Sequence, residues 1–245
     1  MSKTLLEIAA NSVASGIAAQ EGGADRIELC AALGVGGITP SHGMMTLARE
    51  RVHIPIHVLI RPRGGDFLYD DNELEEMQRD IHAAKSIGCE GVVIGTLDAD
   101  GDVDKARCRE LASAASGMHI TFHRAIDVCR DPLQALEDII ALGCGRILTS
   151  GGQPSADAGT RAIAELVARA AGRIEIMPGG GVTPDNVLAI AQHTGAAAVH
   201  ASAKAQLASG MRLRAGVLPD MESGASRTDV ARVRALVATL HDHTR

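Results

Sequence analysis

The sequence predicts an α/β protein, a (β/α)8 TIM barrel that forms a single domain over residues 1–245. Short apolar segments alternate with amphipathic segments along the chain, and eight such pairs can be counted. A glycine-led pattern also recurs before every second strand, as expected for a barrel built from paired units. Eight units in 245 residues fit a closed barrel better than an open doubly wound sheet, which is the alternative fold.

Each predicted strand is a short run of aliphatic and β-branched residues bounded by turn residues. The eight strands are expected at residues 5–9, 26–30, 56–61, 92–96, 120–124, 147–149, 173–177 and 197–202. Helices are expected between them at 12–21, 41–50, from 71 onward, 104–113, 131–142, 158–171, from 183 onward and 229–241.

The helix boundaries follow from capping residues and from periodicity. Thr39–Pro40, Asp131–Pro132 and Thr183–Pro184 each place a good N-cap residue before a proline, which is the typical start of a helix. The helix from Asp71 carries apolar residues at helical spacing, which predicts one buried face. These apolar residues are Leu74, Met77, Ile81 and Ala84.

The repeat consists of a glycine, a small residue, two further residues and then a strand. It reads GADRIELC from Gly23, GCEGVVIG from Gly88, GCGRILTS from Gly143 and GAAAVHAS from Gly195. In each copy the glycine is expected to end a helix, and the strand begins about four residues later. The copies precede strands two, four, six and eight.

Alternate residues of a barrel strand point inward, so the strand alignment predicts what fills the interior. The odd strands place Glu7, His57, Thr121 and Glu175 at equivalent positions, followed by Ala9, Leu59, His123 and Met177. The even strands place Glu28, Val93, Leu148 and His200 together, followed by Cys30, Gly95, Ser150 and Ser202. Carboxylates and imidazoles therefore converge inside, where a barrel kept only for stability would carry branched aliphatic residues.

This polar interior predicts a functional site, because burying ionisable groups costs several kcal/mol each unless they pair or bind something. The candidate catalytic residues are Glu7, Glu28, His123, Glu175 and Arg61. His57 and His200 are also consistent with ordinary core histidines. The alternative is a structural network in which the three carboxylates pair with nearby arginines. Those arginines are Arg61, Arg63 and Arg124.

The stretch RIEIMPGGGVTP, residues 173–184, predicts an anion-binding loop. Its strand stops at Pro178 and is followed by three glycines and a helix start, so that several backbone N–H groups can face one anion. A tight turn that needs glycine for its geometry is the alternative. The candidate substrate- or anion-binding residues are Arg63, Ser150, Gly151, Gly179, Gly180, Gly181 and Ser202.

Composition and charge exclude several function classes. The net charge is −6 with no basic run, and the chain has no Trp, one Tyr and two Phe, which argues against nucleic acid and acidic membranes as partners. No apolar run is long enough to span a membrane, and no signal peptide is evident. The five cysteines form no C-x-x-C pair, which argues against disulfides and zinc. We expect a cytoplasmic protein that forms a homodimer.

Several motifs resemble the CutC copper homeostasis family over residues 4–204. They are GADRIELC, GGITPS, IRPRGGDF, TFHRAID, RILTSGG, GGGV and HASA. The resemblance implies a TIM barrel, a cytoplasmic location and copper as the bound ion, with Cys30 as the copper residue because it closes the ELC block. His123 and His200 could complete that metal site. Ile126, Pro178 and the tail after Lys204 depart from the family pattern.

The resemblance thus predicts copper binding, trafficking or tolerance, whereas the residues themselves leave other functions open. Cu(I) prefers thiolate and thioether ligands, and the inward carboxylates suit harder metals. The rival hypothesis is an enzyme that performs isomerisation or lyase-like proton abstraction on a small phosphorylated or anionic metabolite. A non-catalytic metal buffer is the third. The segment 204–228 is expected to be a long loop that serves as a lid or an oligomer arm.

Overall fold

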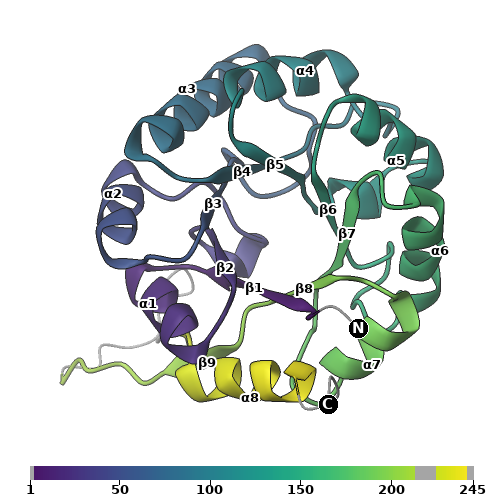
Figure 1. Cartoon of the computed structure of the whole chain (residues 1–245). Coiled ribbons are helices and arrows are strands. Elements are labelled where there is room, and N and C mark those ends of the chain that lie inside the picture. Colours follow the sequence, from purple (N-terminus) through teal and green to yellow (C-terminus); the bar gives the residue numbers. More distant parts are fainter. Residues whose placement is uncertain (1–2, 213–224, 242–245) are drawn as a thin grey trace.

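A computed structural model describes residues 3–212 and 225–241 of the chain. Eight parallel strands form one sheet with the order β7-β6-β5-β4-β3-β2-β1-β8. A parallel bridge between Gly179 and His200 joins its two edges and closes the barrel (Figure 1). The strands are β1 (Leu5–Ala10), β2 (Arg26–Leu29), β3 (Ile56–Leu59), β4 (Gly91–Ile94), β5 (His119–Phe122), β6 (Arg146–Thr149), β7 (Glu175–Pro178) and β8 (Ala198–Ala201). The predicted (β/α)8 barrel is confirmed.

The helices form a ring outside the strands (Figure 1). They are α1 (Val13–Gly22), α2 (His42–Arg51), α3 (Asp71–Ile87), α4 (Lys105–Ala114), α5 (Pro132–Ala141), α6 (Thr160–Ala170), α7 (Val187–Thr194) and α8 (Val230–His241). The apolar stripe of α3 is buried as predicted. Among the residues that the structure describes, no helix is both long and apolar enough to cross a membrane.

The four glycines of the sequence repeat share one conformation. Gly23, Gly88, Gly143 and Gly195 have φ values of 91°, 87°, 80° and 69°, in the left-handed region that side chains with a Cβ disfavour. Three of them cap α1, α3 and α7 directly, and Gly143 follows the C-cap of α5. The repeat therefore marks the point at which each helix ends and the chain turns back into an even-numbered strand.

The apolar core lies mainly between the strands and the helices. Its largest fully buried side chains include Phe122, Ile27, Ile56 and Ile94, which point away from the barrel axis. The polar residues on the same strands occupy the alternate positions and face the axis instead. The interior of the barrel thus holds ionisable side chains, as the strand alignment in the sequence predicts.

Some local predictions need correction. The helix after β7 begins at Val187 and not at a Thr183 cap, because the Thr183 N–H donates to Asn186 Oδ1 (2.8 Å) in a turn that precedes the helix. The helix near residue 41 is capped by Ser41, which accepts from the Met44 N–H (3.2 Å). Two short 3-10 helices, η1 (Leu33–Val35) and η2 (Arg124–Val128), follow β2 and β5, so the fifth strand ends at Phe122 and not at Arg124 as predicted.

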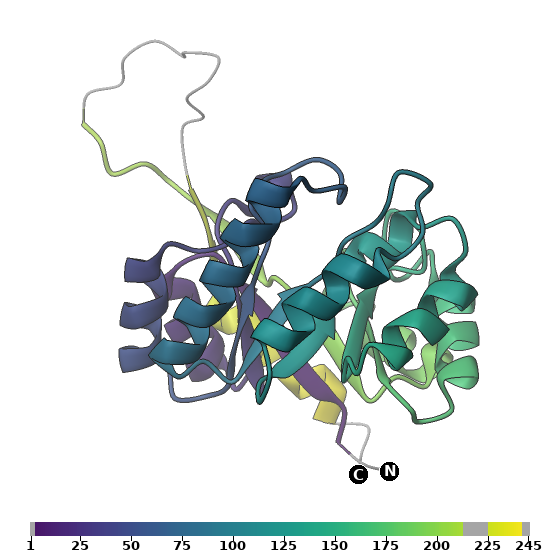
Figure 2. The same cartoon turned by 90° about the horizontal axis from the view of Figure 1, so that it is seen from above.

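The segment 204–228 contains regular structure at both of its ends. Strands β9 (Lys204–Leu207) and β10 (Ala225–Thr228) pair in an antiparallel manner, with Lys204 opposite Thr228. The chain leaves the barrel here on the side opposite the two termini (Figure 2). The proposed lid or arm also includes residues 213–224, which lie outside the described residues, so its role stays a prediction.

Candidate functional site

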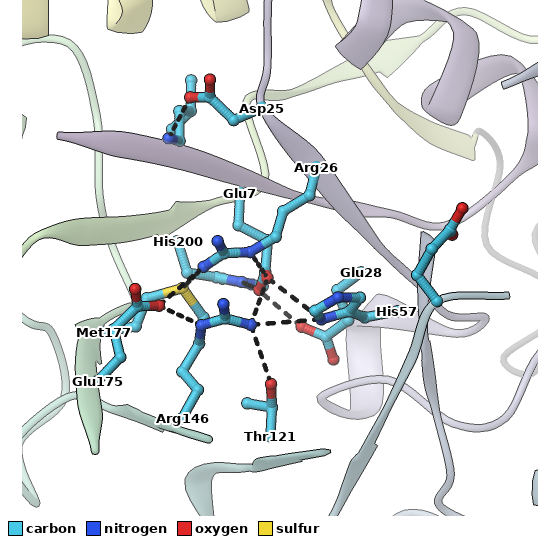
Figure 3. Close-up of polar contacts among 12 residues, drawn as sticks. Glu7, Asp25, Arg26, Glu28, His57, Thr121, Arg146, Glu175, Met177 and His200 are labelled. Carbon is cyan, nitrogen blue, oxygen red and sulfur yellow. Dashed lines mark hydrogen bonds and ion pairs between the residues drawn. The ribbon is translucent and has the colours of Figure 1, made fainter. Parts of the chain in front are cut away.

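An ion-pair network fills the amino-terminal half of the barrel interior (Figure 3). Glu7 of β1 accepts from Nε of Arg26 on β2 at 2.5 Å and contacts Nδ1 of His200 on β8 at 2.8 Å. Burial alone would raise the pKa of Glu7, but the hydrogen bond to His200 and the charge of Arg26 outweigh it and hold that pKa well below its usual range. Glu7 is therefore an ionised carboxylate whose oxygens are already engaged.

The network continues across the barrel through Arg146 of β6. Its Nε pairs with Glu175 of β7, its Nη1 donates to Thr121 Oγ1 at 3.2 Å and to His57 Nδ1 at 3.3 Å, and the same Nη1 lies 3.8 Å from Glu7 Oε2. Burial lowers the pKa of His57 to about 3, so this imidazole is neutral and accepts the bond. The contacts join strands on opposite walls, which shows that the side chains converge on the axis.

Sequence reasoning named the carboxylates of this network but missed its arginines. The expected partners were Arg61, Arg63 and Arg124, whereas the observed partners are Arg26 and Arg146. A signal was present, because each missed arginine stands two residues before a predicted inward residue on its strand and so faces the same side. Part of the structural alternative is thus correct, with other cations than those expected.

His200 connects this network to the carboxyl ends of the strands. Its Nδ1 contacts Glu7, and its Nε2 lies 3.4 Å from Glu28 Oε2. Burial opposes the charged imidazolium, but the hydrogen bond to Glu7 and the charges of Glu28 and Glu7 outweigh it and raise the pKa of His200. Burial raises the pKa of Glu28 to about 7. Glu28 can therefore gain or lose a proton near neutral pH.

A pocket of about 520 Å³ opens above His200 at the carboxyl ends of the strands. Its lining includes Glu28 and Cys30 of the second strand unit, His200 of β8 and Arg61 after β3. Cys30 is buried beside Leu59 and Val93. Burial and the charge of Glu28 raise the pKa of its thiol far above the ordinary value, so a free thiolate is disfavoured there.

Arg61 and His123 form one wall of the pocket together with Phe67. The Arg61 guanidinium lies 5.0 Å from the Phe67 ring centroid, and the Phe67 and His123 centroids are 4.8 Å apart. The terminal nitrogens of Arg61 donate to loop carbonyls at 2.7 to 2.8 Å. Burial, with the nearby Arg61 charge, lowers the pKa of His123 to about 3. Both side chains are held rigidly, and His123 is neutral.

The predicted anion-binding residues divide into two groups. Gly180, Gly181 and Ser202 line the pocket, and their binding of an anion stays a prediction. Gly179 instead packs closely over Leu148, where an added Cβ would lie 2.5 Å from Leu148 Cδ1. Ser150 and Gly151 do not line the pocket: the Ser150 Oγ donates to the Gln153 carbonyl at 2.6 Å and accepts from Arg124 Nη2 at 2.7 Å, and Gly151 lines a separate cavity of about 270 Å³ beside α6.

The sequence assigned anion binding to Arg63 and a structural ion pair to Arg124, but it is Arg124 that lines the pocket. Arg63 is absent from the pocket lining and pairs with Glu73 at 2.5 Å and Asp66 at 3.1 Å, so it folds its own loop. Arg124 does line the pocket. It pairs with Asp127 at 2.7 Å and donates to Ser150 Oγ at 2.7 Å. Its position directly after His123 at a strand end was the available signal.

One group of side chains has metal-ligand spacing among the described residues. Ligand atoms of Glu7, Glu28 and His200 all lie within 4.8 Å of one another. The sequence prediction had combined Cys30, His123 and His200. His200 is common to both sets, and Cys30 lies in the same pocket, but His123 belongs to the wall formed with Arg61. The carboxylate and imidazole donors fit a divalent copper ion better than Cu(I).

The sequence model of the CutC family matches residues 4–205. A relative from Xylella fastidiosa (strain 9a5c), named a family protein CutC, is 53% identical over 238 residues, which cover 96% of this chain and 88% of the relative. The chain belongs to the CutC family.

Other members agree with this assignment. A human protein named copper homeostasis protein cutC homolog is 45% identical over 240 residues and covers 96% of this chain and 88% of its own length. The crystal structure of a copper homeostasis protein CutC from Streptococcus agalactiae superposes with a TM-score of 0.78 at 36% identity and covers 81% of this chain and 98% of that one. The resemblance predicted from the motifs is therefore confirmed.

Proposed function

We propose that this protein acts in copper homeostasis and binds a copper ion as its cargo at the floor of the pocket. Glu28 and His200 are the proposed ligands, and the Cys30 thiol lies in the same pocket. The observation that carries the proposal is the convergence of Glu7, Glu28 and His200 within 4.8 Å in a chain whose human relative is named for copper homeostasis.

The bonding of His200 supports this assignment. Metal-binding histidines commonly donate one ring N–H to a carboxylate, which leaves the other nitrogen for the metal. His200 has this arrangement, since Nδ1 contacts Glu7 at 2.8 Å and Nε2 faces Glu28 at 3.4 Å. A copper ion bound there would take the place of the proton between Nε2 and Glu28. Glu7 then acts as a positioning residue, because Arg26 already neutralises it.

Copper titration of the purified protein, with a competing chelator, tests the proposal. We expect one copper ion per chain, and at least tenfold weaker binding in Glu28→Gln. The matched control is His82→Asn, because His82 is exposed on α3 and surface histidines also attract copper. Cys30→Ser separates the thiol from the other donors. Copper binding that is unchanged in Glu28→Gln and in Cys30→Ser would contradict the proposed site.

The proposal places the protein in the cytoplasm. All five cysteines are free, four of them buried, which fits a reducing compartment. The expected homodimer also stays a prediction, and sedimentation analysis of the purified protein checks it. A dimer that forms without copper would show that self-association does not depend on the metal.

A further inference from the structure

Two buried hydrogen-bond donors on residues that line the pocket have no partner in the described part of the chain. They are Nε of Arg61 and Nε2 of His123. Each residue is at least 95% buried, and both line the pocket. The His123 Nδ1 accepts from the Ala125 N–H at 3.2 Å, so the proton of the neutral ring sits on Nε2 and makes it a donor. An unsatisfied buried donor destabilises the fold, and a ligand oxygen would remove that penalty.

The charge of the lining points to the same kind of ligand. The chain carries a net charge of −6, yet four cationic side chains line the pocket and Glu28 is its one acidic residue among those described. The cations are Arg61, Arg124, Lys204 and Arg232. A concave site with such an excess of positive charge concentrates anions from solution.

Opposite the Arg61 wall, the turn after β7 offers backbone donors. Gly180 and Gly181 have φ values of 96° and 71°, and neither N–H finds a partner within the described residues. Successive N–H groups in left-handed turns form a concave cradle for anions. Arg124 stands beside it, since a Cβ added to Gly180 would lie 3.5 Å from Arg124 Nη1. This nitrogen also has no partner in the described part of the chain, whereas Nε and Nη2 are bound.

We propose that the pocket binds a small organic phosphate that also carries a carboxylate or carbonyl group, the phosphate against Gly180, Gly181 and Arg124 and the carboxylate or carbonyl oxygen against Arg61 and His123. A phosphate has enough oxygens for two backbone donors and a guanidinium. A carboxylate or carbonyl at the other end satisfies the two orphaned nitrogens. The site lies above the proposed copper ligands and does not depend on them.

The test measures binding of three probes by calorimetry in buffer that contains a metal chelator: inorganic phosphate, glycerol 3-phosphate and 3-phosphoglycerate. The chelator separates this proposal from copper binding. We expect inorganic phosphate and glycerol 3-phosphate to bind with similar affinity, and 3-phosphoglycerate to bind at least tenfold more tightly because its carboxylate reaches the second subsite. Wild-type protein that binds none of the three at millimolar concentration overturns the proposal.

Variants test which residues bind the phosphate and which bind the carboxylate of the ligand. Arg124→Gln should weaken all three probes about tenfold, and the matched control Arg130→Gln should not, since Arg130 is exposed and pairs with Asp102 outside the pocket. His123→Phe keeps an aromatic ring against Phe67 and should remove the advantage of 3-phosphoglycerate while inorganic phosphate still binds. If His123→Phe does not fold, the wild-type affinities decide the second subsite: 3-phosphoglycerate that binds no more tightly than glycerol 3-phosphate overturns it. Equal losses in Arg124→Gln and Arg130→Gln overturn the phosphate assignment.

Discussion

The polar groups in the two halves of the barrel interior differ in whether they have partners. In the amino-terminal half, Arg26 and Arg146 form ion pairs with Glu7 and Glu175, so the charged groups of this half are paired with one another (Figure 3). At the carboxyl ends, by contrast, two buried donors have no partner among the described residues, and the pocket lining encloses about 520 Å³. The paired half takes the place of an aliphatic core, and the unpaired half is free to bind ligands. His200 contacts both halves, through Glu7 on one side and Glu28 on the other.

The largest expected effect comes from breaking the paired half. Glu7→Gln should lower the free energy of unfolding by about 3–5 kcal/mol, because it removes the buried negative charge that pairs with Arg26 and His200 and leaves Arg26 with Glu175 alone. Urea unfolding followed by circular dichroism measures the change. The double variant Glu7→Leu with Arg26→Met should recover much of the loss, since it removes both buried charges. A double variant as unstable as the single one would show that the lost pairing is not the cause.

At the boundary between the two halves, Glu28 should make a smaller contribution to stability, and this contribution depends on pH. Burial raises the pKa of Glu28 from its ordinary value of 4.5 to about 7. A folded-state pKa above the unfolded one favours folding at low pH, and this contribution is lost as the pH rises through 7. Glu28→Gln cannot ionise, so it should be more stable than the wild type at pH 8, by at most about 3 kcal/mol, and similar to it near pH 5.

Urea midpoints at pH 5, 6.5 and 8 check this prediction. His82→Asn on the surface of α3 serves as the control for a changed titratable group, and its difference from the wild type should stay small throughout. If the stability difference between Glu28→Gln and the wild type does not grow between pH 5 and pH 8, Glu28 ionises without a cost to folding. The two halves of the barrel interior would then differ less than their contacts suggest.

The same comparison explains what could be predicted from the sequence. The period of two along each strand placed Glu7, Glu28 and His200 inside the barrel, and the repeated glycines fixed the ends of the helices. The pairing of Glu7 with Arg26 was not predictable in this way, because it depends on the side chains that neighbouring strands bring to the same height. Beyond the strand ends periodicity no longer applies, so the local signal that favoured Arg124 over Arg63 was its position directly after His123 at a strand end.

The smallest effect is expected at Arg63, which the sequence associated with the pocket and the structure assigns to a loop. Its guanidinium is part-exposed and holds Glu73 and Asp66, so Arg63→Ala should cost less than about 1 kcal/mol of unfolding free energy. Phosphate binding should stay as in the wild type, whereas Arg124→Gln should weaken it about tenfold. If calorimetry shows that Arg63→Ala weakens phosphate as much as Arg124→Gln does, the cationic site extends over the loop and the pocket is larger than its lining indicates.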